Sequence, residues 1–191
     1  MEQLEQAPHS GRPPEVTMIH WGCLDTPLGR LFVAVSPRGV VSVGTSDGTE
    51  SAFLARAEAE LGARTELAPG PAPLLDRALD ELAAYFAGTC RSFTVPLDWR
   101  LLRGAFNARI LESLCAVPWG HLVSYSELAR RAGAPRAARA AGSACKANPL
   151  PILVPCHRVV HANGGIGGYS GPGVAYKRGL LAIEEVVFPT R

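Results

Sequence analysis

The stretch PILVPCHRVVHANGGIGGYS, residues 151–170, sets a cysteine among strongly apolar residues. Cys156, His157 and Arg158 directly follow one short apolar run, and a second apolar pair comes after them. Strand-like pieces on both sides predict an extended segment that shields the thiol from bulk water. Only the thiolate is nucleophilic and a free thiol has a pKa of about 8.5, so we expect the neighbouring cations to favour the thiolate. An isolated buried cysteine is usually structural, but these polar neighbours indicate a nucleophile.

Charge is distributed unevenly along the 191 residues, whose net charge is only +2. Between Glu127 and Glu184 there is no acidic residue, and this segment contains eight basic ones. They are Arg130, Arg131, Arg136, Arg139, Lys146, Arg158, Lys177 and Arg178. Such an excess predicts a polyanionic partner, above all nucleic acid. The alternative is a solvated basic surface.

The five cysteines are an odd number, widely spaced and without a CxxC pair, which argues against a disulfide scaffold and a zinc module. Cys156 and His157 would point to opposite faces of an extended chain and so would not share a metal. We therefore expect no metal and no cofactor. The sequence has no signal-peptide core and no apolar run of membrane-spanning length. These features predict a soluble, cytoplasmic protein without a membrane partner.

The first half of the chain predicts a small support domain over residues 16–90, preceded by a flexible tail over 1–15. Short strand-like runs over 17–46, separated by Pro and Gly, indicate an antiparallel meander. Apolar residues at helical spacing predict helices over 50–61 and 75–86. No catalytic constellation is visible in this half.

A connector over 91–103, anchored by Trp99, leads to a C-terminal domain over 104–191. There Ser124 and Glu127 fit a capping box, in which Ser124 caps a helix and Glu127 reaches back. A Gly-containing turn and a second helix, over 135–147, complete a helix-turn-helix. The predicted fold class is α+β: a small N-terminal antiparallel sheet with helices, and a mostly helical C-terminal domain that contains the helix-turn-helix and the cysteine.

The second of these helices combines small side chains with cations. Small side chains let a helix approach another surface closely, which is either a neighbouring helix in the core or the groove of DNA. The small residues are Ala137, Ala138, Ala140, Ala141, Gly142 and Ser143, and the cations are Arg136, Arg139 and Lys146. Cys145, on the same helix, is expected to be a small side chain that faces the groove.

After Cys156, Asn163-Gly164 predicts a hairpin turn before Ile166. The glycines that follow allow the backbone to wrap closely around a ligand, and Tyr169 and Ser170 are expected to form the wall of a pocket. A closing helix is predicted over 174–185.

The motif PCHRV, preceded by Asn148 and followed by the glycine-rich turn and Tyr169, resembles the active-site signature of the O6-alkylguanine-DNA alkyltransferases, the methylated-DNA–protein-cysteine methyltransferases. The resemblance is close over residues 104–184. It implies direct displacement, in which Cys156 takes the alkyl group from O6 of guanine in DNA. The thioether product has no hydrolysable acyl carbon, so the protein would be consumed in a single turnover.

The resemblance also implies a role for each site residue. Cys156, a bridging water, His157 and Glu184 would form a proton relay, and Asn148 would brace the segment. Tyr125 would donate a proton or hydrogen bond to the guanine ring. The remaining predicted contacts to the base are the backbone of Val159, Tyr169 and Ser170.

For DNA, the resemblance implies that the second helix lies in the minor groove and that Arg139 enters the base stack after the damaged nucleotide is extruded, a step that costs a few kcal/mol. Ala137, Ala138, Ala140 and Gly142 would face the groove. Arg136 and Lys146 are expected to contact phosphates. The expected partner is double-stranded DNA containing O6-alkylguanine; the protein is expected to be a monomer in solution, while cooperative clustering of copies on DNA stays open.

Two other classes of protein would use part of this pattern. A cysteine hydrolase also combines Cys, His and an acid, but it turns over acyl substrates and has no use for the recognition-like helix. A non-enzymatic DNA-binding module, either a regulator or an alkyltransferase-like lesion marker, would explain the two helices but would not need Cys156. Alkyl transfer alone accounts for both features.

Overall fold

The computed structural model describes residues 17–45, 49–62, 65–69 and 72–186, so the predicted tail over 1–15 lies outside the described residues. The chain is α+β, as predicted. Its elements in chain order are β1 (Thr17–Thr26), β2 (Gly29–Ser36), β3 (Gly39–Thr45), α1 (Glu50–Leu61), β4 (Thr65–Pro69), α2 (Pro73–Phe86), η1 (Trp99–Leu101, a 3-10 helix), α3 (Ala105–Cys115), β5 (Val123–Ser124), α4 (Tyr125–Arg131), α5 (Ala138–Lys146), η2 (Cys156–Arg158, a 3-10 helix), β6 (Val159–Val160) and α6 (Gly173–Ile183).

The N-terminal sheet has the strand order β3-β2-β1-β4. The predicted antiparallel meander is confirmed for β1, β2 and β3, but β4, which was not predicted, pairs in parallel with β1 and makes the sheet mixed. The cause is the connection: α1 crosses over between β3 and β4, so β4 runs in the direction of β3 and hence of β1.

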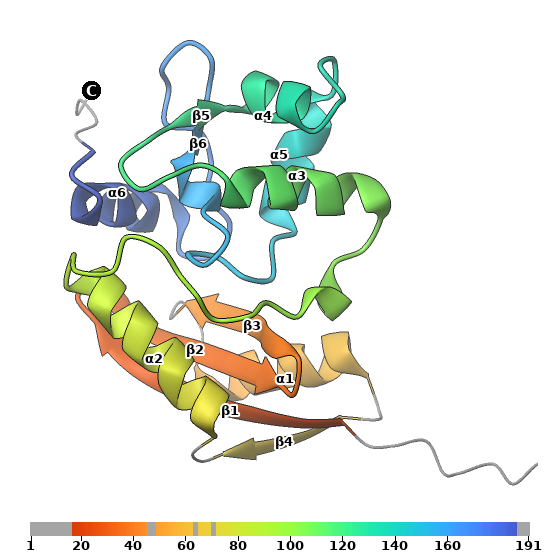
Figure 1. The fold of residues 1–191 in the computed structure, drawn as a ribbon, viewed down its shortest axis with the longest axis vertical. Coiled ribbons are helices and arrows are strands. Elements are labelled where there is room, and N and C mark those ends of the chain that lie inside the picture. Colours follow the sequence, from red (N-terminus) through yellow and green to blue (C-terminus); the bar gives the residue numbers. More distant parts are fainter. Residues whose placement is uncertain (1–16, 46–48, 63–64, 70–71, 187–191) are drawn as a thin grey trace, which may run out of the picture.

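The central strand β2 is buried on both faces, because successive side chains of a strand point to opposite sides. Leu31 and Val33 belong to the core beneath α2, whereas Phe32 stacks on Phe53 of α1 with a ring-centroid distance of 5.4 Å. Figure 1 shows α2 and α1 on opposite faces of the sheet. The helices predicted over 50–61 and 75–86 are therefore the two layers that cover it.

The segment predicted as a connector, residues 91–103, runs along the edge strand β3. The Val40 N–H donates to the Pro96 carbonyl (2.9 Å), and the Asp98 N–H donates to the Val40 carbonyl (2.8 Å). Trp99 is partly buried against the main core, as expected for an anchor.

Two helix predictions in the C-terminal half need correction. Ser124 caps α4 by accepting from the Glu127 N–H (3.1 Å), but the Glu127 carboxylate pairs with Arg130 and Arg131 instead of reaching back. The second helix begins at Ala138, later than predicted, because Pro135 lies in a turn closed by the hydrogen bond from the Ala137 N–H to the Ala134 carbonyl (2.9 Å).

The segment before Cys156 is a tight turn, and Cys156 itself lies on η2, so the prediction of extended chain was wrong there. Pro151 and Pro155 flank this turn and have no N–H to give to a sheet ladder. Ile152 in the turn is fully buried with φ 77°, a conformation that is rare for a β-branched residue. A strand forms only afterwards, where β6 pairs in parallel with β5.

The glycine-rich loop turns as predicted but does not return as a strand. The His161 N–H donates to the Gly165 carbonyl (2.8 Å), and Gly164 takes a φ of +81° that suits glycine. The residues around Ile166 stay irregular.

The two halves are packed together beside the segment that contains Cys156. One continuous apolar core extends from β2 and α2 to α3 and α6. The Val43 N–H of β3 donates to the Pro149 carbonyl (2.9 Å), and Leu28 packs so closely on α6 that a Cβ at Gly179 would lie 2.5 Å from its side chain. In Figure 1 the upper end of α2 lies beside α6. No helix in the described part of the chain is long and apolar enough to cross a membrane.

Candidate active site

Cys156 is buried at the start of η2 and is held by Asn148. The Asn148 side-chain amide donates both to the Val154 carbonyl (2.9 Å) and to Cys156 Sγ (3.3 Å). Its Oδ1 accepts from the Leu150 N–H (3.0 Å). A single amide therefore fixes the turn and contacts the sulfur.

His157 and Arg158 both point at Glu184, which lies just beyond α6. His157 Nε2 is 2.7 Å from Glu184 Oε1, and Arg158 donates through Nε to Oε2 (2.9 Å) and through Nη2 to Oε1 (2.9 Å). The Gly120 N–H adds a further donor (3.2 Å). Burial opposes the ionisation of Glu184, but the hydrogen bonds from His157 and Arg158 outweigh it and lower the pKa of the carboxyl to about 2.

This arrangement fixes the tautomer of His157. A carboxylate can only accept hydrogen bonds, so Nε2 carries the proton and Nδ1 presents its lone pair. Burial lowers the pKa of the imidazole, although the Glu184 charge opposes this shift, and the ring is neutral at pH 7. Nδ1 is buried and has no hydrogen-bond partner among the described residues. Nδ1 is thus the nitrogen of His157 that is able to accept a proton.

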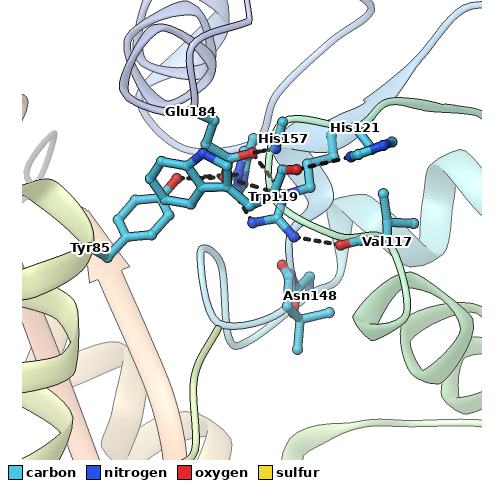
Figure 2. A network of polar contacts seen from close by, with 10 residues as sticks. Tyr85, Val117, Trp119, His121, Asn148, His157 and Glu184 are labelled. Atoms are coloured by element: carbon cyan, nitrogen blue, oxygen red, sulfur yellow. Dashed lines mark hydrogen bonds and ion pairs between the residues drawn. The ribbon is translucent and has the colours of Figure 1, made fainter. Parts of the chain in front are cut away.

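Tyr85 joins this network from the N-terminal half, where no catalytic constellation was predicted. Its hydroxyl donates to Glu184 Oε1 (2.9 Å) and lies 3.3 Å from His157 Nε2. Figure 2 shows Tyr85 reaching from α2 to this pair. Burial and the Glu184 charge raise the pKa of Tyr85, so it stays a donor. In the sequence Tyr85 belongs to the apolar pattern of α2, which gives no hint of a polar role. Such a role could have been suspected only because a buried tyrosine hydroxyl usually needs a hydrogen-bond partner.

The expectation that neighbouring cations favour the Cys156 thiolate holds for the Lys177 charge alone, and burial outweighs that charge. Burial raises the pKa of the thiol, and this outweighs the opposing effects of the Asn148 hydrogen bond and the Lys177 charge. Arg158, which is close to Cys156 in sequence, forms its ion pair with Glu184 instead. The thiol is therefore protonated at neutral pH.

Cys156 opens into a cavity of about 250 Å³, here called the thiol cavity. Its lining residues are Tyr125, Gly142, Cys145, Lys146, Cys156, Gly168, Tyr169 and Ser170. Most of the predicted substrate contacts thus meet around the thiol. Cys145 is buried in this wall and does not face outward as predicted; burial raises the pKa of its thiol to about 12.

Tyr125 stands at the start of α4, beside the glycines of the cavity wall. A Cβ at Gly167, where φ is +74°, would lie 3.1 Å from the Tyr125 hydroxyl, and one at Gly142 would lie 3.7 Å from its ring. The absence of a side chain at these two glycines therefore leaves room for the Tyr125 ring. Partial burial raises the pKa of Tyr125, so its hydroxyl can donate at neutral pH.

Val159 is not among the residues that line the thiol cavity, and its carbonyl accepts a hydrogen bond from Lys177 Nζ. Lys177 is fully buried and also donates to the carbonyls of Ile166 (2.7 Å) and Gly168 (3.4 Å). Burial lowers the pKa of Lys177 to about 8. Lys177 thus links the glycine-rich wall to β6. This structural role was missed from the sequence, because Lys177 was grouped with the cations expected to bind a polyanion.

The acid-free segment offers less free charge than the sequence suggests. Arg158 and Lys177 are buried, and Arg130 and Arg131 pair with Glu127. On α5 and the turn before it, Arg136, Arg139, Ala140 and Lys146 are exposed, Ala137, Ala138 and Gly142 are half-buried, and Ala141 is in the core. The three exposed cations form no ion pair with any residue in the described ranges.

Within residues 17–45, 49–62, 65–69 and 72–186, no group of three or more His, Cys, Asp or Glu side chains could hold a metal ion. All five cysteines lie in these ranges and are free.

Known proteins resemble the chain over nearly its whole length. Residues 19–99 match the family model of the 6-O-methylguanine DNA methyltransferase ribonuclease-like domain, and residues 105–186 match that of the DNA binding domain of the same family. The methylated-DNA–protein-cysteine methyltransferase of Mycobacterium tuberculosis is 39% identical over 169 residues, covering 88% of this chain and 93% of the relative. That of Cricetulus griseus is 36% identical, covering 93% of this chain and 86% of the relative.

Solved structures agree with these matches. The crystal structure of Mycobacterium tuberculosis OGT in complex with DNA aligns with a TM-score of 0.72 at 39% identity, covering 87% of this chain and 93% of that one. The O6-methylguanine-DNA methyltransferase of Pyrococcus kodakaraensis aligns with a TM-score of 0.66 at 26% identity, covering 88% of this chain and 100% of that one.

Proposed function

Because the chain belongs to the family of the methylated-DNA–protein-cysteine methyltransferases, we propose that it repairs double-stranded DNA by moving the alkyl group from O6 of guanine to Sγ of Cys156, once per protein molecule. The observation that carries the proposal is the buried thiol at the wall of the thiol cavity, next in sequence to a histidine whose other nitrogen is held by a carboxylate. A nucleophile beside a base that a third group orients is the general arrangement of covalent catalysis.

The first step is removal of the thiol proton. Cys156 is protonated at rest because burial raises its pKa. Nδ1 of His157 is the free acceptor, and a water between the two groups would carry the proton to it. Glu184 stabilises the imidazolium that forms, and Tyr85 and Arg158 hold Glu184 in place. Asn148 keeps the sulfur in position during this transfer.

The second step is displacement at the alkyl carbon. The thiolate electron pair forms the S–C bond while the C–O6 bond breaks and its electron pair leaves with guanine. Tyr125 donates to the ring and neutralises the charge that develops there. Overall, the proton that left the Cys156 thiol replaces the alkyl group on guanine, so His157 and Tyr125 end in their starting protonation states and the protein keeps a thioether. Tyr169 and Ser170 are proposed to enclose the base, whereas Val159 contributes through Lys177 to the wall.

DNA binding is proposed for α4, the turn and α5, acting as a helix-turn-helix on the minor groove. The exposed Ala140 and the half-buried Ala137, Ala138 and Gly142 would permit close approach, and Arg136 and Lys146 would contact phosphates. Arg139 would fill the gap left by the extruded nucleotide. Residues 16–90 are proposed as the support domain, 91–103 as the connector and 104–191 as the reactive domain. We further propose that the protein acts as a monomer in the cytoplasm, where its free thiols stay reduced.

The test is intact-mass and peptide mass spectrometry after mixing the protein with a duplex that contains one O6-methylguanine. One methyl group on the Cys156 peptide, added stoichiometrically and without turnover, is the expected result. A Cys156→Ser variant should bind the duplex and gain no mass. Tight binding without any mass change in the unaltered protein would point instead to a lesion-recognition protein, and transfer surviving in Cys156→Ser would overturn the choice of nucleophile.

A further inference from the structure

A second cavity, of about 290 Å³, lies between the two halves of the chain and is here called the interdomain cavity. It shares the lining residues Lys146, Tyr169 and Ser170 with the thiol cavity, so the two cavities adjoin at these residues. Asn148, which contacts the reactive sulfur, also lines it. The proposed alkyl transfer has no use for this space when the group is methyl.

The charges around the interdomain cavity are mostly positive and come from three separate segments of the chain. Arg56 is on α1, Arg103 follows η1 and Lys146 ends α5, whereas Glu60 is the one carboxylate among the lining residues. All four are exposed, and none forms an ion pair with a described residue. An anion in this space would meet an excess of two positive charges.

Contacts with Phe53 and Gly44 position the Arg56 side chain. Its guanidinium lies 5.9 Å from the centre of the Phe53 ring, a distance suited to a cation–π contact. A Cβ at Gly44 would lie 2.5 Å from the Phe53 ring and 3.1 Å from Arg56 Nη2. The glycine in β3 therefore makes room for Arg56 to lie against the sheet at the edge of the cavity.

We propose that the interdomain cavity receives the far end of long O6-alkyl groups and selects those that end in a carboxylate. The inference rests on the proposed function, because the reacting carbon must lie at Cys156 in the thiol cavity. A longer chain then has to pass the shared wall of Tyr169, Ser170 and Lys146. The reaction is unchanged: the S–C bond forms, the C–O6 bond breaks, and the carboxylate takes no part.

The expected selectivity follows from the charges. Two net charges acting through partly screened surroundings should raise the rate for a carboxylate about tenfold, which corresponds to about 1.4 kcal/mol. The effect belongs to groups at the surface, so it should fall as the ionic strength rises. The methyl group of O6-methylguanine is too short to reach these cations, so they should not affect its rate of transfer.

The experiment compares single-turnover rates on three duplexes that differ only in the O6 substituent: methyl, 3-carboxypropyl and the uncharged 3-carbamoylpropyl. We expect the carboxylate to react about tenfold faster than the amide. Arg56→Gln with Arg103→Gln should bring this ratio close to one and leave methyl transfer unchanged, while Glu60→Gln should raise the ratio. Arg109→Gln, an exposed arginine on α3 outside the cavity, is the matched control and should change nothing.

The outcomes separate the two proposals. Equal rates for carboxylate and amide, with methyl transfer intact, would overturn the selectivity and leave the proposed function standing. Absence of transfer even from the methyl duplex would overturn the proposed function itself. If the double variant slowed all three substrates equally and weakened binding to undamaged DNA, the cavity would hold a DNA phosphate and the inference would be wrong.

Discussion

Replacing Tyr85 by Phe removes one hydroxyl from the relay and leaves the ring in the core of α2. The hydroxyl donates at 2.9 Å to the buried carboxylate of Glu184. Hydrogen bonds to charged groups contribute about 1.5–3 kcal/mol. Because the donors on His157, Arg158 and Gly120 remain, we expect a loss near the lower value, about 1.5 kcal/mol in the free energy of unfolding. That corresponds to a fall in Tm of roughly 3–6 °C for a domain of this size.

The effect on alkyl transfer should have a distinct signature. A relay loosened by a similar energy would slow single-turnover transfer roughly tenfold. Without the hydroxyl, the Glu184 charge acts more strongly on His157 and raises the pKa of the imidazole, which burial otherwise lowers. Transfer needs the neutral ring, so the acidic limb of the pH–rate profile should move to higher pH.

Tyr176→Phe is the matched control, because Tyr176 is also buried and its hydroxyl makes no hydrogen bond to the relay residues described above. It should leave the pH–rate profile in place. If Tyr85→Phe lowered Tm but kept the rate and the profile of the unaltered protein, Tyr85 would be a packing residue only and the positioning role would be refuted.

Three further changes test the other parts of the site. Arg139→Ala should weaken transfer from duplex DNA at least tenfold more than transfer from free O6-alkylguanine, measured as two second-order rates; equal losses would argue against a role in extrusion. Gly167→Ala should cost about 1 kcal/mol or more in stability, because φ is +74° and the new Cβ would lie 3.1 Å from the Tyr125 hydroxyl, and chemical denaturation checks this. Glu184, with its pKa lowered to about 2 from 4.5, stabilises the fold fully above about pH 4.5, and this contribution is lost as the pH falls towards 2. Glu184→Gln should therefore be less stable at pH 7, since Arg158 loses its partner, but should lose less on acidification; an unchanged acid dependence in denaturation experiments would contradict the assignment.

The sequence by itself determined the features that rest on local patterns. Ser124 reads as a helix cap because a hydroxyl at that position satisfies a free N–H of the helix within three residues. The meander of β1 to β3 and the helices α1 and α2 follow from apolar periodicity and from Pro and Gly between the runs. The motif around Cys156 indicated a candidate nucleophile and a candidate base, because these two residues are adjacent in the chain.

Only the tertiary structure decided what those residues face. Tyr85 and Glu184 are far apart in sequence and meet through one carboxylate, a contact that no local spacing encodes. Arg158 pairs with Glu184 and not with the sulfur. Burial raises the pKa of Cys156 and lowers that of His157, so both are neutral at pH 7. Lys177 reads as a free charge in the sequence but is desolvated against three carbonyls in the fold. Residue type and spacing are local properties, whereas desolvation and charge pairing depend on what the rest of the chain brings alongside, and these last two determine the chemistry available to the thiol.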